Sequence, residues 1–398
     1  QKPQQPHKMN HFPTDLRNNL QSALAQLWGG PVKLSPLQVF ENHEHVQRLC
    51  VEQAPAGAPA TLILKQAREA FDPQADDFSS AAIFNEWASL EFLRELFGED
   101  APIPRLYAAN RTAGWLALED LGDGDPVLDA LFGSDPQRAS AQIQRFGEIL
   151  GHLHSRARPH LAQFLQRRRA LSRFTPSTPG ELADFIPDSV QTLSRLLNID
   201  LPPAALEDAH QAFDILTHSD DFVTFVHNDA APNNLLEKDG RLCLYDFEAA
   251  SWQPALLEGA NLRMYFPTMG LKFTHRLPES AWRPAETAYR AALIEGCPAA
   301  ANDAHWADTL VAACAYWTLA YVQGPLSIEW ALTAEHPHLD HIRQCRLARF
   351  DTFAQTAAEF DRLPHLARFC TAVTTHLRAR WPDAVEPLPL FPAFHQNP

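Results

Sequence analysis

Five short apolar runs in the first third of the chain predict β-strands. Each run is rich in β-branched, leucine or aromatic residues and is bounded by turn-forming residues. The segment Ala54–Pro59, for example, separates the second run from the third. The pattern predicts a small antiparallel sheet. The five runs are Leu37–Phe40, Val46–Val51, Thr61–Lys65, Arg105–Ala109 and Trp115–Leu118.

A helical period lies between the third and fourth runs. Ile83, Trp87 and Leu90 recur at spacings of four and three, and the pattern ends at Gly98, a residue suited to the end of a helix. Glycines and acidic residues at 119–125 mark a boundary, after which helical spacing dominates. These patterns predict an α+β fold with a small, mainly β part followed by a larger, mainly α-helical part.

Three segments follow from these boundaries. Residues 1–20 begin with a polar, proline-rich stretch, and we expect them to be a disordered or extended tail. Residues 21–121 would form an N-terminal lobe with the sheet and one helix. Residues 122–398 would form a helical C-terminal lobe, with a helix that begins at Asp135-Pro136.

Composition and charge exclude several classes of protein. The 398 residues carry 33 basic and 48 acidic side chains, a net charge of −15, and 45% are hydrophobic. No apolar run is long enough to span a membrane, and the acidic balance argues against a nucleic-acid partner. The longest basic run, Arg167–Arg169, is typical of a solvated helix face. Six scattered cysteines without a CxxC pair suggest reduced thiols, so we expect a cytoplasmic protein.

One stretch concentrates residues that could carry chemistry. Asp239-Gly240 lies between two apolar runs and predicts a two-residue hairpin turn, which would place Asn234 opposite Tyr245. Asn234 and Asp246 would then lie at the same end of the hairpin, and Asp229 lies in the loop that leads into it. Carboxylate and amide oxygens suit Mg²⁺, which leaves its other positions to water and phosphate.

The order of these residues resembles a known family. His227-x-Asp229-x-x-x-x-Asn234, followed by Asp246-Phe247-Glu248, is similar to the motifs of the aminoglycoside phosphotransferase and choline kinase group, small-molecule kinases with a bilobal protein-kinase-like fold. The resemblance implies that Asp229 is the catalytic base, and that Asn234 and Asp246 bind the Mg²⁺ that accompanies ATP. For His227 a packing and loop-anchoring role is expected.

The resemblance also implies nucleotide-binding residues upstream. Lys65, at the end of the third run, would contact the phosphates and pair with Glu86 on the following helix, although Glu91 lies on the same helix as an alternative. The segment that contains Glu119 and Leu121 resembles the hinge whose backbone binds the adenine edge. The resemblance covers the chain from about Gln38 to Arg263.

Two departures from the family pattern stand out. The turn Phe40–His45 contains no glycine, where kinases commonly place glycines close to the phosphates, so the choice between ATP and GTP stays open. Glu258 occupies a position where the family usually has an aspartate, which leaves its supporting role in doubt.

Together these features predict a phosphotransferase that moves the γ-phosphoryl group of ATP to a hydroxyl of a small molecule, such as an aminoglycoside, an amino alcohol or a sugar-like acceptor. The net charge of −15 is compatible with a cationic acceptor. A non-catalytic nucleotide-binding protein is the main alternative. A protein kinase is less well supported, because no arginine precedes Asp229 and no Ala-Pro-Glu follows Asp246.

Overall fold

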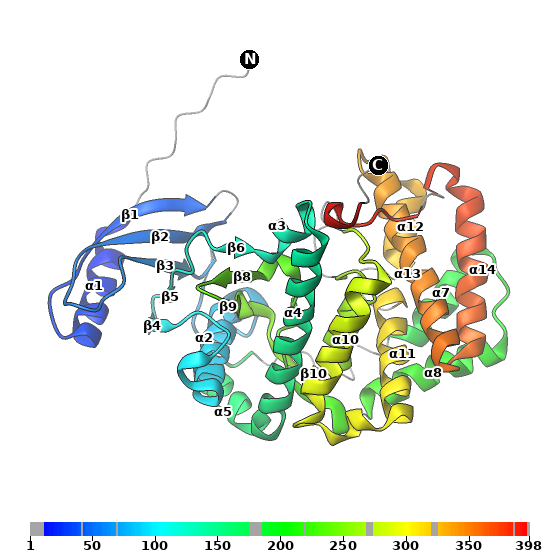
Figure 1. Ribbon diagram of the computed structural model, residues 1–398, viewed down its shortest axis with the longest axis horizontal. Coiled ribbons are helices and arrows are strands. Elements are labelled where there is room, and N and C mark those ends of the chain that lie inside the picture. Colours follow the sequence, from blue (N-terminus) through cyan, green and yellow to red (C-terminus); the bar gives the residue numbers. More distant parts are fainter. Residues whose placement is uncertain are drawn as a thin grey trace, which may run out of the picture. The chain divides into compact units, whose positions relative to one another are not determined.

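The computed structural model describes residues 12–40, 43–68, 71–174, 185–218, 220–267, 274–319, 325–384 and 387–395 (Figure 1). The chain forms two compact units. The first unit comprises residues 1–124, 162–176 and 238–249, and the second comprises residues 125–161, 177–237 and 250–398.

The first unit contains a five-stranded antiparallel sheet in the order β1-β2-β3-β5-β4. Each of the five predicted strands is present. On the central strand, Lys65 lies opposite Val46 on one neighbour and Leu116 on the other. The strands are β1 (Lys33–Phe40), β2 (His43–Gln53), β3 (Thr61–Gln66), β4 (Leu106–Asn110) and β5 (Trp115–Glu119).

Two helices use opposite faces of β3. Helix α1 (Thr14–Trp28) buries Leu24 in a core that includes Leu64, whereas Lys65 pairs with Glu86 of α2 (Phe78–Phe97). Successive side chains of a strand point to opposite faces, so β3 separates an apolar core from a charged site. As predicted, α2 ends at Gly98, whose φ of 65° favours glycine.

The expected N-terminal tail is shorter than predicted. Residues 14–20 belong to α1, because Leu20 and Leu24 bury completely against the sheet and make this helix part of the core. Residues 1–11 lie outside the described residues.

Two later segments also belong to the first unit, so the predicted C-terminal lobe is not one continuous segment. Helix α5 (Leu161–Leu171) brings Phe164 to 5.5 Å from the ring of Phe92, and β9 (Arg241–Leu244) places the Leu244 N–H 2.8 Å from the carbonyl oxygen of Pro102. Both Asp239 and Gly240 have positive φ, at 54° and 75°, as the predicted turn requires.

The second unit is mainly helical. The pattern at Asp135 predicted a helix start, and its carboxylate caps the N–H groups of Gln137 and Arg138 at 2.9 and 3.1 Å. Strand β7 (Val223–Val226) pairs with β10 (Ser251–Pro254), and β6 (Asp125–Pro126) pairs with β8 (Leu235–Lys238). The helices are α3 (Val127–Phe132), α4 (Pro136–Ala157), α7 (Phe185–Leu197), α8 (Pro203–Thr217), α9 (Leu256–Gly259), α10 (Glu279–Ile294), α11 (Asp303–Leu319), α12 (Pro325–Thr333), α13 (Leu339–Phe360) and α14 (Pro364–Arg380).

The expected α+β class is confirmed by a sheet in the first unit and a helical second unit. Within the described residues, none of the helices combines the length and the apolar character that crossing a bilayer requires.

Helices α4 and α10 lie side by side (Figure 1) and approach closely through glycines of α4. A Cβ atom at Gly147 would lie 2.3 Å from the Ala285 carbonyl oxygen, and one at Gly151 would lie 2.5 Å from the Tyr289 carbonyl oxygen. Both distances are shorter than any van der Waals contact, so α4 needs glycine at these positions.

We predict that Gly147→Ala lowers the free energy of unfolding by about 1–3 kcal/mol, because the new methyl group forces α4 away from α10. Helix propensity alone would change stability in the opposite direction, by up to about 1 kcal/mol. Urea unfolding followed by tryptophan fluorescence measures the difference. Gln144→Ala, on the exposed face of the same helix, is the control. Unchanged or increased stability of Gly147→Ala would contradict this packing.

Candidate active site

A buried lysine organises the charged site of the first unit. The Lys65 Nζ lies 2.5 Å from the Glu86 carboxylate, pairs with Asp246, and lies 3.8 Å from the Glu248 carboxylate. Lys65 and Glu86 are 8% and 1% exposed. The structure therefore brings together Lys65, Glu86 and Asp246, which lie far apart in the sequence.

The helix partner of Lys65 is Glu86. The alternative, Glu91, instead accepts a hydrogen bond from the Trp87 indole nitrogen at 2.7 Å. Both glutamates are on α2, but Glu86 is buried and pairs with Lys65, whereas Glu91 is exposed.

The three carboxylates change the proton affinity of the site. Burial alone would lower the pKa of Lys65, but the negative charges of Glu86, Asp246 and Glu248 outweigh burial and raise this pKa above its ordinary value. Burial raises the pKa of Glu86 to about 7, despite the favourable charge of Lys65. A second cation, Arg68, pairs with Glu248 at 2.6 Å, so the site holds two cations and three carboxylates.

A buried hydrogen-bond chain holds the turn that follows Asp246. The Asn85 side chain donates to the Glu248 carbonyl oxygen at 2.9 Å, and Arg168 donates to the Asn85 side-chain oxygen at 2.8 Å. Arg168 is only 2% exposed, so the expectation that Arg167–Arg169 is a solvated face is wrong at its central residue. Sequence reasoning also missed Asn85, because an asparagine within a helix gives no signal of its partner.

In the second unit, the predicted catalytic loop brings Asp229 and Asn234 together. The Asn234 side-chain nitrogen donates to both the carboxylate and the carbonyl oxygen of Asp229, each at 2.9 Å. Its amide oxygen accepts one hydrogen bond, from the Asn233 side chain at 3.1 Å. The orientation of the amide is thus fixed by Asp229, with nitrogen toward the carboxylate.

Glu258 holds the backbone of this loop. Its buried carboxylate accepts the N–H groups of His227, at 3.2 Å, and of Asn228, and it lies 2.9 Å from the His154 Nε2. Glu258, although longer than the usual aspartate, therefore supports the loop backbone, the role that the sequence left in doubt. His227 is completely buried, and its Nδ1 accepts the Asp229 N–H at 3.2 Å, in agreement with a loop-anchoring role.

The charge of Glu258 depends on these partners. Burial opposes ionisation, but the hydrogen bonds from His154 and the Asn228 N–H, with the neighbouring imidazoles, lower the pKa of Glu258 below its ordinary value. A charged, buried carboxylate thus fixes the backbone on both sides of residue 228, where φ is 71°.

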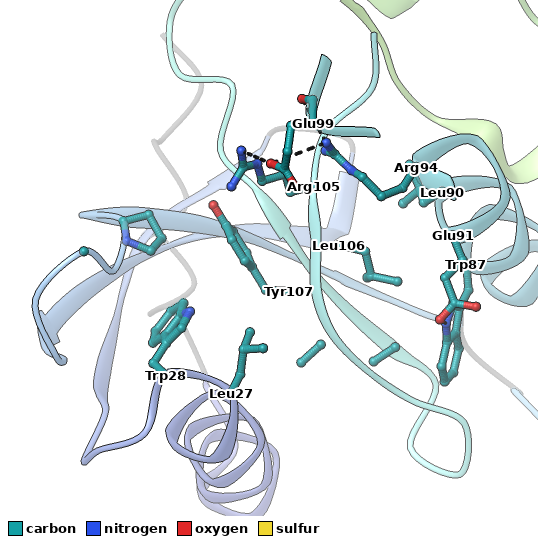
Figure 2. A pocket seen from close by; sticks show the side chains of 14 residues that line it. Leu27, Trp28, Trp87, Leu90, Glu91, Arg94, Glu99, Arg105, Leu106 and Tyr107 are labelled. Atoms are coloured by element: carbon teal, nitrogen blue, oxygen red, sulfur yellow. Dashed lines mark hydrogen bonds and ion pairs between the residues drawn. The ribbon is translucent and has the colours of Figure 1, made fainter. Parts of the chain in front are cut away.

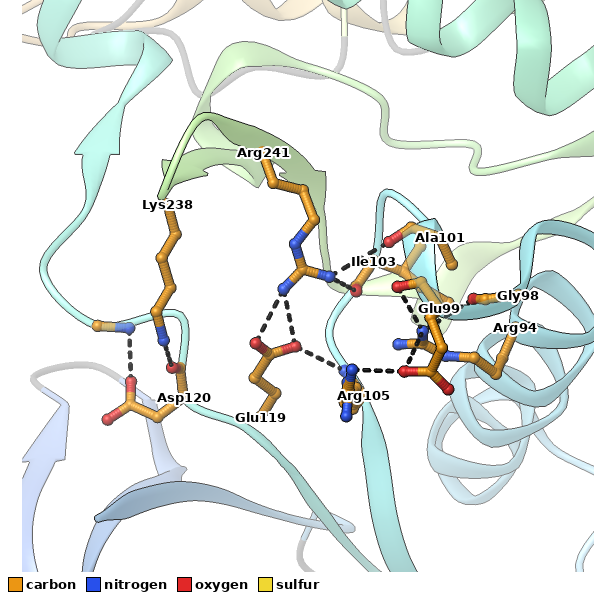
Figure 3. Close-up of polar contacts among 11 residues, drawn as sticks. Arg94, Gly98, Glu99, Ala101, Ile103, Arg105, Glu119, Asp120, Lys238 and Arg241 are labelled. Carbon is orange, nitrogen blue, oxygen red and sulfur yellow. Dashed lines mark hydrogen bonds and ion pairs between the residues drawn. The ribbon is translucent and has the colours of Figure 1, made fainter. Parts of the chain in front are cut away.

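The predicted hinge uses its side chains for structure (Figure 3). The Glu119 carboxylate accepts two hydrogen bonds from Arg241, at 2.8 and 3.0 Å, and one from the Arg105 N–H at 3.1 Å. The Asp120 carbonyl oxygen accepts from Lys238 at 2.6 Å. In the described part of the chain, the Leu121 N–H has no hydrogen-bond partner. Backbone groups of this segment are therefore the ones that a ligand could use.

A groove of about 600 Å³ lies along the edge strand β4 (Figure 2). Trp28 of α1 and Trp87 of α2 lie on opposite sides of it, with Tyr107 of β4 between them. None of the predicted site residues lines this groove. It is a feature of the first unit separate from the Lys65 cluster.

Asp246 and Asn234, the predicted magnesium ligands, each carry an oxygen donor of the kind that Mg²⁺ prefers. Across the described ranges, no three His, Cys, Asp or Glu side chains form a group that could hold a metal. The predicted pair is instead one carboxylate, Asp246, whose side chain is 37% exposed, and one amide oxygen, that of Asn234. These two residues belong to different units. In the glycine-free turn, Glu41 and Asn42 lie outside the described residues.

A model of the phosphotransferase enzyme family matches residues 38–295, more than half of the chain. The chain belongs to this family. The match begins where the sequence resemblance begins and continues past Arg263 to the end of α10. Among curated proteins, no sequence matches this chain.

Several solved structures are similar to this chain. A protein from Ralstonia eutropha JMP134, provisionally named an aminoglycoside phosphotransferase, is 15% identical over 88% of this chain and 99% of its own, with a TM-score of 0.50. A choline/ethanolamine kinase family protein from Mesorhizobium loti is 14% identical over 90% and 99%, with a TM-score of 0.39. A macrolide 2′-phosphotransferase from Brachybacterium faecium is 15% identical over 90% and 98%, with a TM-score of 0.42. The family model confirms the predicted family, and the first of these structures confirms the predicted fold.

For this phosphotransferase-family chain, we predict that Glu258→Gln lowers the free energy of unfolding by about 2–3 kcal/mol near pH 7, because a charged acceptor of two buried N–H groups is lost. The folded-state pKa of Glu258 is lowered, so its stabilisation is present above the unfolded value of about 4.5 and is lost as the pH falls through the folded-state pKa.

Urea unfolding of both proteins at several pH values tests this prediction, and the difference between them should shrink in acid. Glu148→Gln, on the exposed face of α4, is the control. A difference that does not depend on pH would contradict the assigned charge of Glu258.

Proposed function

We propose that this protein is an ATP-dependent phosphotransferase that moves the γ-phosphoryl group to a hydroxyl of a small molecule. The observation that carries the proposal is the buried Lys65, paired with Glu86 and Asp246 in a chain of the phosphotransferase enzyme family. Burying an ammonium among carboxylates costs desolvation energy, which a purely structural role does not explain. A lysine–glutamate ion pair is, however, part of the phosphoryl-transfer machinery of protein kinases.

The first unit would bind the nucleotide. Lys65 would contact the phosphates, with Glu86 fixing the position of its ammonium. Backbone groups at Glu119 and Leu121 would bind the edge of the base, since their side chains are either engaged with Arg241 or apolar. Because Glu41 and Asn42 of the phosphate turn are outside the described residues, GTP remains an alternative to ATP.

Asn234 and Asp246 would hold Mg²⁺. When bound, this ion would neutralise charge on the phosphates. Support for the assignment comes from the surroundings of each residue taken separately: the Asn234 amide is turned so that its nitrogen meets Asp229, and Asp246 lies in a cluster of three carboxylates with its side chain 37% exposed.

Asp229 would orient the acceptor hydroxyl and accept its proton. Because phosphoryl transfer is largely dissociative, positioning contributes more than the strength of the base. The loop supplies that positioning, since Asn234 holds the Asp229 carboxylate and Glu258 holds the preceding backbone. The acceptor would be a small molecule with a hydroxyl group, the broad class to which the acceptors named for the similar proteins belong.

We predict that Asp229→Asn lowers acceptor-dependent ADP release by about 10²-fold or more, the usual contribution of a general base. Asp246→Asn should abolish turnover at millimolar Mg²⁺. Asp239→Asn is the matched control, because Asp239 is exposed in the hairpin turn and asparagine tolerates its positive φ. A coupled ADP assay over a broad set of small alcohols measures all three.

Other outcomes would distinguish the alternatives. Near-normal activity of Asp246→Asn would contradict the metal assignment. Nucleotide binding without turnover on any acceptor would indicate a non-catalytic protein, and transfer to protein serine or threonine would indicate a protein kinase.

A further inference from the structure

Two neighbouring arginines of α13 are buried in the second unit. Arg346 is 5% exposed and Arg349 is 1% exposed. They are three residues apart on one helix, so their side chains lie on neighbouring positions of the same face.

Neither guanidinium has a carboxylate partner in the part of the chain that the structure describes. Arg346 makes no hydrogen bond there, and its Nε and Nη1 atoms are buried. Arg349 donates only from Nε, to the Met264 carbonyl oxygen at 3.3 Å, and its buried Nη1 has no acceptor.

Two other buried arginines can be compared with this pair. Arg263, in the same unit, pairs with both Glu286 and Glu359. Arg168, in the first unit, is satisfied only in part: it donates to Asn85 and lies over the ring of Phe174 at 5.9 Å, but both of its Nη atoms are buried without an acceptor among the described residues. Arg346 has neither kind of partner.

The energetics of the pair are unfavourable without an anion. Burial, together with repulsion from Arg349, lowers the pKa of Arg346 to about 9, and burial lowers the pKa of Arg349 to about 10. A buried cation without a counter-charge is strongly destabilising, whereas a bound oxyanion would satisfy both guanidinium groups. The buried hydroxyl of Thr274 interacts with the thiol of Cys345, the residue before Arg346.

A short segment connects these arginines to the catalytic loop. At one end Asn261 donates to the carbonyl oxygen of Ala230, next to Asp229, at 3.1 Å. At the other end Met264 accepts from Arg349. Three residues of chain span at most about 11 Å between Cα atoms, so one short segment contacts both Arg349 and the loop. Tyr265 follows at a φ of 58°, a strained backbone of the kind found at functional sites.

We propose that Arg346 and Arg349 form the anion-binding part of the acceptor pocket, so that the acceptor carries a carboxylate or phosphate group besides the hydroxyl that is phosphorylated. This inference rests on the proposed phosphotransferase function and names its substrate class. It differs from the cationic acceptor expected from net charge, because Arg346 and Arg349 are two buried cations without a carboxylate partner among the described residues.

The first experiment tests the anion site without catalysis. Inorganic phosphate, titrated at constant ionic strength, should raise the thermal midpoint of the wild-type protein. Arg346→Met should fold without loss of stability, since it removes an unpaired buried charge, and it should bind phosphate at least about tenfold more weakly.

Two control variants locate the effect. Arg343→Met, one turn earlier on α13, removes an arginine that already donates to Ala331 and should leave the phosphate effect unchanged. Lys65→Met should also retain it. A phosphate effect that is lost in Lys65→Met and kept in Arg346→Met would overturn the proposal.

The second experiment tests the link to the acceptor. ADP release is compared for hydroxy acids and their neutral methyl esters, for example glycerate and methyl glycerate. We expect kcat/KM to favour the acid by at least tenfold in the wild type and the preference to disappear in Arg346→Met.

The outcomes separate this inference from the proposed function. Turnover that favours neutral or cationic alcohols would overturn the inference and leave the phosphotransferase intact. Phosphate binding at Arg346 without any preference for acids would assign the site to a separate effector and overturn the acceptor role. The absence of ADP release with every acceptor would instead overturn the proposed function, while the phosphate titration would still test the anion site.

Discussion

The ammonium of Lys65 is the interaction on which the first unit depends. It is buried on the central strand, so it must be neutralised, and the neutralising carboxylates come from α2 and from the segment after β9. The same strand turns Leu62 and Leu64 toward α1. Segments far apart in the sequence are thus held together by one charge on one face of the sheet and by an apolar core on the other.

The second unit also contains a buried charge, of the opposite sign. Glu258 is buried, and three donors from His154, His227 and Asn228 compensate for it. Both sites follow the rule that a buried charge persists only with partners. Arg346 and Arg349 depart from that rule. This departure is the basis of the anion site that we propose.

Much of the fold could be predicted because its signals are local. Short apolar runs bounded by turns are typical of strands, and all five strands of the sheet were found in this way. The first part of α1 was not predicted, because prolines and glutamines precede it. The burial of its apolar residues also depends on the sheet, which comes later in the sequence. Asp239-Gly240 predicted a tight turn correctly, since positive φ favours those two residues.

The residues around the candidate site were harder to predict. Their types and spacing identified Asp229, Asn234, Asp246 and Lys65, but burial is a tertiary property. Arg168 in a basic run, and Arg346 on a helix with other arginines, both have the sequence pattern of a solvated surface. Glu258 was doubtful because the sequence cannot show that a longer side chain reaches the same N–H groups. The distinction between Glu86 and Glu91 likewise depends on which face of α2 is buried.

Equilibrium binding of Mg-ATP tests the central claim most directly, because it requires neither a known acceptor nor turnover. Isothermal titration calorimetry of the wild type, of Lys65→Met and of Lys33→Met would be compared, since Lys33 is an exposed lysine of the same sheet. The account predicts that Mg-ATP binds to the wild type and to Lys33→Met alike, and at least about tenfold more weakly to Lys65→Met. Equal binding to all three proteins, or no binding to the wild type, would contradict the account.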